Sequence, residues 1–335
     1  MTPVETIVAE GAFDPATLVA RERPVIVKGL AADWPIVERA REGRASVIGY
    51  LKGFDAGRPV VGFTGDPAIG GRFFYNDEVT SLNFTASRVG LGAFLDRIVA
   101  APDDGTSFYV GSTDLDTYLP GFRGENDLGL DPARLGGVSP IASIWIGNRT
   151  IAATHYDMSN NIACCLVGRR RFTLFPPDQV VNLYPGPLEP TPGGQVVSMV
   201  DLRAPDFALY PRFAQALDAA QVADLEPGDV LVYPALWWHN VEALDAFNVM
   251  VNYWWNPVPR FMDTPMNTLL HGLLSLRDRP EGEKRAWRTM FDYYVFGEAR
   301  RACAHLPDHA RGALGPLDEA GARRLRAQLL SRLNR

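Results

Sequence analysis

The segment from residue 138 to residue 256 constrains the fold most strongly, because it breaks into short runs rich in β-branched and aromatic residues. Glycine, proline, asparagine or aspartate separates each run from the next, which is typical of strands joined by turns. Many short strands of this kind predict an antiparallel β-sandwich or jelly roll. The run LVGRRRF further predicts a tight hairpin that turns at Gly168. The expected strands are IASIWIGN, NIACCLVG, RRFTLFPP, GQVVSMV, DVLVYPA, WWHNVEAL and FNVMVNYWWN.

A change of pattern near residue 258 divides the chain. Beyond NPVPR (256–260), apolar residues recur at helical spacing in MNTLLHGLLSLRDR and EKRAWRTMFDYYVFG, and LDEAGARRLRAQLLSRLNR forms a third predicted helix. We predict a β-rich domain over residues 1–258, in which N-terminal helices and strands wrap the jelly roll, and a C-terminal helical region over residues 259–335. The broad apolar stripes of these helices need a partner surface, which is either a second copy of the chain or the barrel itself.

The composition argues against several classes of protein. The net charge of −6 disfavours a nucleic-acid-binding protein, because phosphates require a basic face. No apolar run approaches the ~18 residues that span a bilayer, and the first residues do not have the pattern of a signal peptide. Three cysteines, two of them adjacent, make a poor disulfide framework and indicate a reducing compartment. We expect a cytoplasmic protein without a membrane or nucleic-acid partner.

Two histidines and an aspartate form the strongest candidate site. His155 and Asp157 lie two positions apart at a predicted strand end, so both side chains point to the same side. His239 follows Gly228 and Pro234 at the spacing of the second sequence signature of cupin barrels, whose histidine faces the barrel interior. Two histidines and one carboxylate leave coordination positions open, as in non-haem Fe(II) oxygenases, whereas structural zinc sites are closed and richer in cysteine. The histidines of the helical tail are expected to be structural or exposed: His271, His305 and His309.

Further polar side chains are expected inside the barrel. Arg170 alternates with Phe172 and Leu174, and no carboxylate partner is evident in the neighbouring sequence. A bound dicarboxylate would satisfy this guanidinium with a bidentate pair, and the alternative is a solvated turn. Other candidates either contact a metal-bound ligand or serve as structural groups of the core. They are Asn161, Asn252, Trp254 and Tyr109.

These motifs together resemble the cupin-like JmjC family of 2-oxoglutarate oxygenases, and within it the asparaginyl hydroxylase that inhibits the hypoxia-inducible factor. HYD, LFPPDQ, LYP, PGDVL, WWHNVE and VNYWWN stand in the order and at the spacings of that family. The resemblance is strong over residues 140–257 and fainter over residues 20–120, where RPVIVKGLAADWP is similar to the usual entry strand. The helical tail resembles the dimerisation region of the family only in type. The implied fold is a double-stranded β-helix, the cupin jelly roll.

The resemblance also implies an activity and a site. The implied reaction is hydroxylation of a C–H bond by Fe(II), 2-oxoglutarate and O2, with a side chain of a protein or peptide as the substrate. Alternatives are hydroxylation of a small molecule or a tRNA base on the same fold, demethylation that follows hydroxylation, and a non-catalytic metal-binding cupin. Ala152 stands where the family has a threonine, and Arg170 stands where the asparaginyl hydroxylase has a lysine. His155, Asp157 and His239 match the iron ligands; Arg170, Asn161, Tyr109, Asn252 and Trp254 match co-substrate residues.

Overall fold

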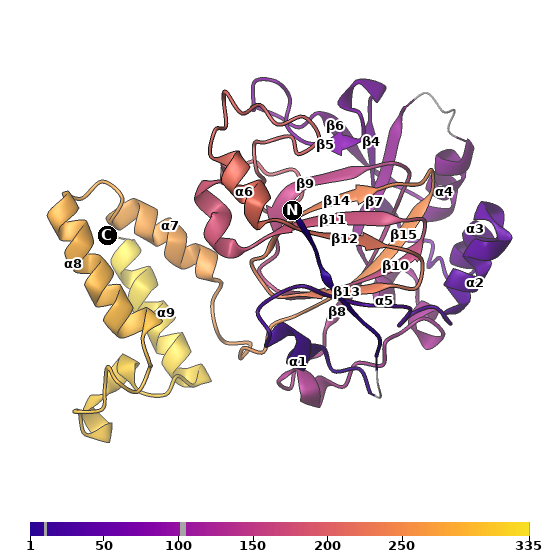
Figure 1. The fold of residues 1–335 in the computed structure, drawn as a ribbon. Helices are drawn as coiled ribbons and strands as arrows, with labels where there is room; N and C mark the ends of the chain where they lie inside the picture. The colour runs from indigo at the N-terminus through magenta and orange to yellow at the C-terminus, as the bar shows by residue number, and fades with distance from the viewer. Residues whose placement is uncertain (10–11, 101–104, 335) are drawn as a thin grey trace. The chain divides into compact units, whose positions relative to one another are not determined.

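The computed structural model describes residues 1–9, 12–100 and 105–334 (Figure 1). The chain divides into two compact units, Met1–Pro257 and Val258–Arg335. The first unit contains two β-sheets and the helices that flank them, and the second unit is helical. The helices of the first unit are α1 (Pro15–Val19), α2 (Pro35–Glu42), α3 (Arg44–Gly53), α4 (Leu91–Ala100), α5 (Leu115–Tyr118) and α6 (Phe213–Ala219).

Two sheets, of six and nine strands, form the core of the first unit. The six-stranded sheet has the order β1 (Thr2–Pro3), β12 (Gln221–Leu225), β11 (Arg170–Phe175), β14 (Trp238–Ala243), β9 (Ile151–Tyr156) and β5 (Arg72–Phe73). The nine-stranded sheet has the order β2 (Glu5–Ile7), β3 (Val25–Val27), β13 (Val230–Tyr233), β10 (Asn160–Val167), β15 (Asn248–Trp255), β8 (Ile141–Gly147), β7 (Ser107–Asp114), β4 (Val60–Gly65) and β6 (Phe84–Val89).

The strands from β8 to β15 make a double-stranded β-helix. Successive strands alternate between the two sheets, except that β11 and β12 pair directly as antiparallel neighbours. Within each sheet these strands pair antiparallel, as β12-β11-β14-β9 and as β13-β10-β15-β8. The predicted jelly roll is therefore confirmed, and the N-terminal strands extend both of its sheets (Figure 1).

The predicted hairpin at Gly168 is wrong. The strands on either side, β10 and β11, belong to different sheets, so this turn carries the chain across the barrel. Gly168 has a φ of +69°, and a Cβ at this position would collide with Asn248 and with the carbonyl of Phe247. Glycine is required because the corner needs both a left-handed backbone and a close approach of β15.

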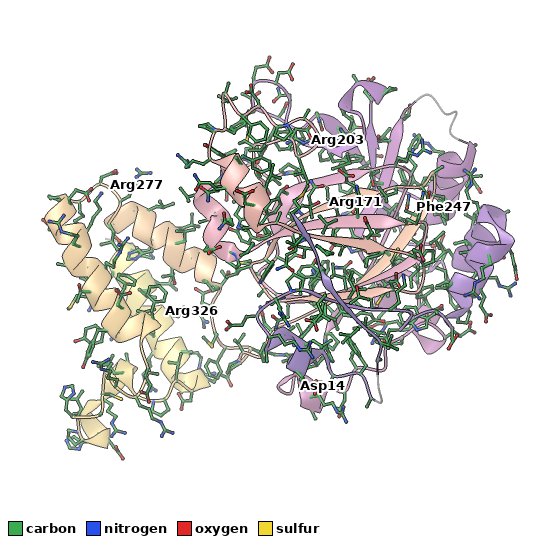
Figure 2. All side chains as sticks on the ribbon, in the orientation of Figure 1. Asp14, Arg171, Arg203, Phe247, Arg277 and Arg326 are labelled. Atoms are coloured by element: carbon green, nitrogen blue, oxygen red, sulfur yellow. The ribbon has the colours of Figure 1, made fainter. Side chains whose placement is uncertain are left out.

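The expected alternation of side chains along β11 nevertheless holds. Arg170 lies in the barrel interior and is only 2% exposed. Arg171 points outward and pairs with Asp224, with 2.7 Å between Nε and Oδ1 (Figure 2). Phe172 is buried again on the inner side. A strand alternates its side chains between its two faces whether it belongs to a hairpin or not, so the face of Arg170 was predictable when its pairing was not.

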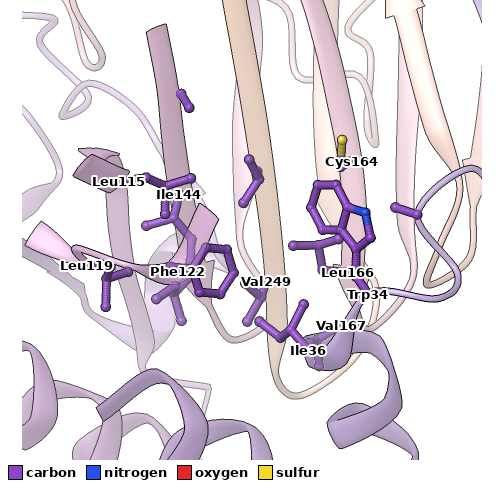
Figure 3. Packing of buried hydrophobic residues seen from close by; sticks show 14 of the residues in the cluster. Trp34, Ile36, Leu115, Leu119, Phe122, Ile144, Cys164, Leu166, Val167 and Val249 are labelled. Carbon is purple, nitrogen blue, oxygen red and sulfur yellow. The ribbon is translucent and has the colours of Figure 1, made fainter. Parts of the chain in front are cut away.

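The main apolar core lies between the nine-stranded sheet and the helices outside it. Ile36 of α2, Leu51 of α3 and Phe94 of α4 are fully buried in this cluster together with Ile144 of β8. Figure 3 shows part of it, with Trp34 close to the residues of β10. Fully burying one such side chain stabilises the fold by about 1.5–3 kcal/mol, so this layer holds the outer face of the sheet rigid. The inner face is left to form the wall of the barrel.

Two smaller clusters cover the six-stranded sheet and fill part of the barrel. Phe175 and Trp238 pack with Phe213 of α6 on the outside of that sheet. Phe172, Leu174 and other inward residues of both sheets fill the barrel interior. Some of these inward residues, Phe172 among them, also line a cavity inside the barrel together with residues of β9 and β14.

The second unit consists of three longer helices. They are α7 (Pro265–Ser275), α8 (Glu281–Phe291), which continues into a π-helical turn (Asp292–Phe296), and α9 (Glu319–Leu333). The side chain of Asp318 caps α9 and accepts a hydrogen bond from the backbone N–H of Gly321 at 2.6 Å. Many apolar side chains of the unit are exposed, among them Leu274 at 77% and Phe296 at 76%.

Among the described residues, no helix is both long enough and apolar enough to span a bilayer.

Candidate metal site and cavity

Strand pairing brings the three predicted metal ligands together. His155 is near the end of β9 and Asp157 follows that strand, while His239 is the second residue of β14. The two strands are antiparallel neighbours, with His155 directly opposite His239, so their ring centroids are 4.3 Å apart. Oδ2 of Asp157 lies 3.7 Å from Nε2 of His239. One potential ligand atom from each residue lies within 4.8 Å of the other two, which is a separation that a single metal ion can bridge.

Both imidazoles have their outer nitrogen occupied by the backbone. Nδ1 of His155 lies 2.8 Å from the carbonyl oxygen of Ala153, and Nδ1 of His239 lies 3.0 Å from the carbonyl oxygen of Trp237. A neutral ring that donates through Nδ1 leaves Nε2 with a free lone pair, which is the state that binds a metal. Both rings are therefore oriented by backbone carbonyl groups, one of them in β9 and the other just before β14.

Burial keeps His239 neutral. Removal from water, together with the neighbouring His155, lowers the pKa of His239 to about 4, although the charge of Asp157 acts in the opposite direction. The ring is consequently unprotonated at neutral pH and its Nε2 is available as a ligand atom.

The carboxylate of Asp157 is held by a chain of amide and indole groups. Asn161 donates from Nδ2 to Oδ2 at 2.7 Å, and Trp254 donates from Nε1 to the same oxygen at 3.1 Å. Asn252 in turn donates from Nδ2 to Oδ1 of Asn161. These contacts follow from the pairing of β10 with β15, which sets Asn161 opposite Trp254. Asn252 and Trp254 also line the cavity, whereas Asn161 is fully buried beneath the carboxylate.

The candidate ligands line a cavity of about 560 Å³ inside the barrel. A proline-rich loop, residues 184–195 (YPGPLEPTPGGQ), contributes Pro192–Gln195 to the lining of the cavity. The N-terminal strands contribute Phe63, Phe73 and Phe84. Ala152, which stands in place of the family threonine, and Thr150 line the cavity as well.

Arg170 is a buried cation without a counter-ion. Its Nε and Nη2 atoms have no hydrogen-bond partner among the described residues. Burial lowers the pKa of this guanidinium, and Tyr109 is near enough to influence it electrostatically. Burial likewise raises the pKa of Tyr109 to about 12, and this phenol lines the cavity. A buried charge normally has a partner, so the guanidinium points to an absent anion.

The sequence motifs did not identify Trp145 and Tyr233 as residues of the cavity. Trp145 of β8 lines the cavity 5.9 Å from the ring of Tyr109, and its Nε1 is buried without an acceptor among the described residues. Tyr233 of β13 lines the cavity with its ring 5.0 Å from that of His239, and burial followed by the charge of Asp157 raises its pKa. The strand periodicity of IASIWIGN and DVLVYPA could have placed both residues on the inner face.

A jelly roll that carries two histidines and an aspartate at one end of its cavity defines the class of this protein as a cupin with a candidate metal site. The sequence model of the cupin-like domain family matches residues 10–261, so the chain belongs to that family. The predicted membership of the cupin-like family is thereby confirmed.

Three relatives are similar in sequence to about a third of this chain. The tRNA wybutosine-synthesizing protein 5 of Danio rerio is 38% identical over 121 residues, which are 36% of this chain and 32% of that protein. The lysine-specific demethylase JMJ31 of Arabidopsis thaliana is 34% identical over 34% of this chain and 21% of that protein. The HSPB1-associated protein 1 of Mus musculus is 35% identical over 34% of this chain and 23% of that protein. The chain thus spans only a fifth to a third of the length of these relatives.

Proposed function

We propose that this chain is an Fe(II)- and 2-oxoglutarate-dependent oxygenase that hydroxylates a C–H bond. The observation that carries the proposal is the buried guanidinium of Arg170, whose Nε and Nη2 atoms have no partner among the described residues. Arg170 lies on β11, the strand that pairs with the one carrying His239, in the same barrel as a set of two histidines and one carboxylate. A metal site alone would suit many cupins. A metal site together with a buried cation that lacks an anion suits a co-substrate with a negatively charged end.

The donor set fits ferrous iron. His155 and His239 would bind through Nε2 and Asp157 through a carboxylate oxygen, which is the mixed nitrogen and oxygen set that suits Fe(II). The cysteines, Cys164, Cys165 and Cys303, are free thiols outside this group, so the set does not resemble a structural zinc site. Iron held there would supply the O2 chemistry in which 2-oxoglutarate becomes succinate and CO2 while one oxygen atom enters the substrate C–H bond.

The surroundings of Arg170 and Tyr109 fit a carboxylate. Nε and Nη2 of Arg170 and the indole Nε1 of Trp145 have no hydrogen-bond partner among the described residues, and Trp145 and the phenol of Tyr109 line the cavity. A carboxylate accepts up to about four hydrogen bonds, and the fork of arginine matches it bidentately. We propose that Arg170 and Tyr109, with Trp145, hold the distal carboxylate of 2-oxoglutarate. Thr150 lies nearby in the lining where Ala152 lacks the family hydroxyl.

The roles that we propose for Asn161, Asn252 and Trp254 differ in part from the co-substrate contacts that the family resemblance implies. Asn161 and Trp254 hold Asp157 through Oδ2, which leaves the other carboxylate oxygen free for the metal. Oδ1 of Asn252 is buried and has no hydrogen-bond partner within the described part of the chain, and Asn252 lines the cavity. We propose that Asn252 and Trp254 border the co-substrate and that Asn161 positions the metal ligand.

A protein or peptide is the proposed substrate class. Two relatives support it by their names, a lysine-specific demethylase and an HSPB1-associated protein. The wybutosine-synthesizing relative favours a second candidate, a modified tRNA base, and the acidic charge of the chain disfavours it. We further propose that the exposed apolar residues of the C-terminal helices pair two copies of the chain.

Calorimetry with the full chain separates the enzyme from a non-catalytic cupin. In the presence of Mn(II) as a redox-inert substitute, 2-oxoglutarate should bind one per chain, and with Fe(II) and O2 the same protein should form succinate slowly even without substrate. Succinate, which lacks the keto group, should bind more weakly. Metal binding without 2-oxoglutarate binding or turnover would support the non-catalytic cupin and contradict the proposed function.

A further inference from the structure

Aromatic rings from the N-terminal strands form one wall of the cavity. Phe63 of β4, Phe73 of β5 and Phe84 of β6 line it, with centroid separations of 5.4 Å for Phe63–Phe84 and 5.1 Å for Phe73–Phe84. Tyr109 continues the wall, 5.6 Å from Phe73. We call Phe63, Phe73 and Phe84 the phenylalanine wall. None of these residues belongs to the proposed metal site, so the wall is available to another molecule.

The described residues that line the cavity offer no counter-ion for a charged substrate group. Asp157 is the only carboxylate among the described residues that line it, and none of these lining residues is a lysine or an arginine. Oδ2 of Asp157 already accepts two hydrogen bonds, and the residue is a proposed metal ligand. The contribution of the proline-rich loop, Pro192–Gln195, is uncharged as well.

The proposed ligands also leave the cavity neutral. Arg170 is not among the described residues that line the cavity, but it lies close enough to Tyr109 of the lining to interact with it electrostatically. The double charge of ferrous iron and the single charge of Arg170 would be balanced by Asp157 and by the two carboxylates of 2-oxoglutarate. An ammonium or a phosphate that entered next to them would lose its hydration without gaining a counter-ion, and a buried unpaired charge is strongly unfavourable. An uncharged group would meet no such penalty.

The geometry of the phenylalanine wall does not form a cage for a cation. Cation–π binding requires ring faces turned toward the ligand. Here the rings pack edge to face, with interplanar angles of 87° for Phe63–Phe84 and 68° for Phe73–Phe84, so in each pair the face of one ring meets the edge of the other. Such a surface favours apolar contact, and each square ångström buried contributes about 25 cal/mol.

We propose that the primary substrate presents an uncharged apolar or aromatic side chain to the phenylalanine wall, so that the chain hydroxylates a hydrocarbon side chain of a protein and does not act on lysine. This inference rests on the proposed function, because the site of oxidation is taken to be the candidate metal site. The inference disfavours two substrates that the names of the relatives suggest. One is lysine, from the lysine-specific demethylase, and the other is a phosphate-bearing nucleotide, from the tRNA-modifying relative.

Matched neutral and cationic probes test the proposal on the full chain loaded with Mn(II) and 2-oxoglutarate. The probes are N-acetyl-leucinamide, N-acetyl-phenylalaninamide and N-acetyl-lysinamide, and binding is followed by saturation-transfer NMR titration. The neutral amides should bind saturably and at least tenfold more tightly than the lysine amide. Equal or tighter binding of the lysine amide, or no binding of either neutral amide, overturns the proposal.

A charge reversal locates the binding surface. Phe84→Glu should reverse the preference toward the lysine amide, and the milder Phe84→Ser, which is the safer variant for folding, should weaken phenylalaninamide binding about tenfold. Phe207→Glu is the matched control, because Phe207 is 47% exposed and outside the cavity lining. If Phe84→Ser and Phe207→Glu bind the amides alike, the wall is not the substrate surface.

The same samples keep this inference separate from the proposed function. Affinity for Mn(II) and 2-oxoglutarate is measured by calorimetry on each variant and should stay within about twofold of the parent chain. Loss of 2-oxoglutarate binding in the parent chain would contradict the proposed function. Unaltered 2-oxoglutarate binding with a preference for the lysine amide would contradict only the inference about the substrate.

Discussion

Trp254 donates a hydrogen bond from its indole Nε1 to Oδ2 of Asp157 at 3.1 Å, across the junction between β15 and the end of β9. The bond joins the two sheets of the barrel at the candidate metal site. Asn161 occupies the same oxygen, so the carboxylate cannot turn without breaking two hydrogen bonds. The side chain of this candidate metal ligand is therefore oriented by the protein itself.

This relationship predicts that Trp254 affects metal affinity through its N–H group. Trp254→Phe keeps an aromatic ring but removes the donor, so Fe(II) affinity should fall about 10-fold, since groups that orient metal ligands typically contribute 10- to 100-fold. Anaerobic calorimetry measures the change. Trp255→Phe is the matched control because Trp255 faces the outer core on the opposite side of β15, and it should lower stability without lowering metal affinity. Equal metal affinities for the two variants would refute the assigned role.

The candidate ligands predict a single iron site that the fold does not need. Asp157→Ala or His239→Ala should abolish binding of one Fe(II) per chain, as measured by elemental analysis after anaerobic loading and desalting. Both metal-free variants should stay folded, because each substitution leaves the apolar clusters of the core in place. His271→Ala, in the C-terminal unit, should bind iron like the parent. Iron retained in both ligand variants would show that the metal binds elsewhere.

We predict that the guanidinium of Arg170 contributes strongly to the affinity for 2-oxoglutarate. Arg170→Met keeps most of the apolar stem and removes the guanidinium, so the affinity should fall by about one to two orders of magnitude, equivalent to a loss of ~1.5–3 kcal/mol. Calorimetry with Mn(II) measures it. The metal-free Met variant should also be at least as stable as the parent, because an unpaired buried charge is removed. Arg171→Met serves as the control, since Arg171 points outward and pairs with Asp224. An unchanged affinity of Arg170→Met for 2-oxoglutarate would show that another residue binds the distal carboxylate.

The adjacent free cysteines Cys164 and Cys165 predict a pH dependence of stability. Burial raises the pKa of Cys165 to about 12 and also raises the pKa of Cys164, whereas an unfolded thiol ionises near pH 8.5. The folded state therefore binds protons more tightly than the unfolded state. This contribution to the free energy of unfolding is fully present below pH ~8.5 and is lost as the pH rises from there toward 12, by about 1.4 kcal/mol per thiol and pH unit.

Urea unfolding at pH 8 and pH 10 measures this effect. Other buried groups titrate in the same range, so the comparison is between the parent chain and a Cys164→Ala, Cys165→Ala variant. The stability of the variant should fall less between the two pH values. Equal losses in both proteins would show that these thiols are not protonated in the folded state at pH 10.

The exposed apolar residues of the C-terminal unit predict a dimer. Leu274 and Phe296 are about three-quarters exposed, and apolar surface of this extent usually marks an interface. Light scattering should give twice the chain mass for the full-length protein and a single chain mass for residues 1–260. Replacing Leu274 and Phe296 with Glu should weaken the dimer, whereas Glu at the exposed Val61 of the first unit should not. A monomeric full-length protein contradicts the prediction.

The sequence alone determined the type of fold and the chemistry of its candidate site. Strand alternation and turn residues over 138–256 predicted the jelly roll, because those preferences are local and act within a few residues. The same alternation placed Arg170 on an inner face. Motif spacing selected His155, Asp157 and His239, and the structure brings their ligand atoms together.

Only the tertiary structure decided which partners those residues have. Gly168 was predicted to close a hairpin, yet its strands join different sheets, because pairing depends on the burial of whole sheets and not on the turn. The hydrogen bond of Asn161 to Asp157 and the missing partner of Arg170 are likewise invisible in the chain. Spacing along the sequence defines the face that a side chain occupies, but its contacts depend on strands distant in sequence, whose register is set by packing across the barrel.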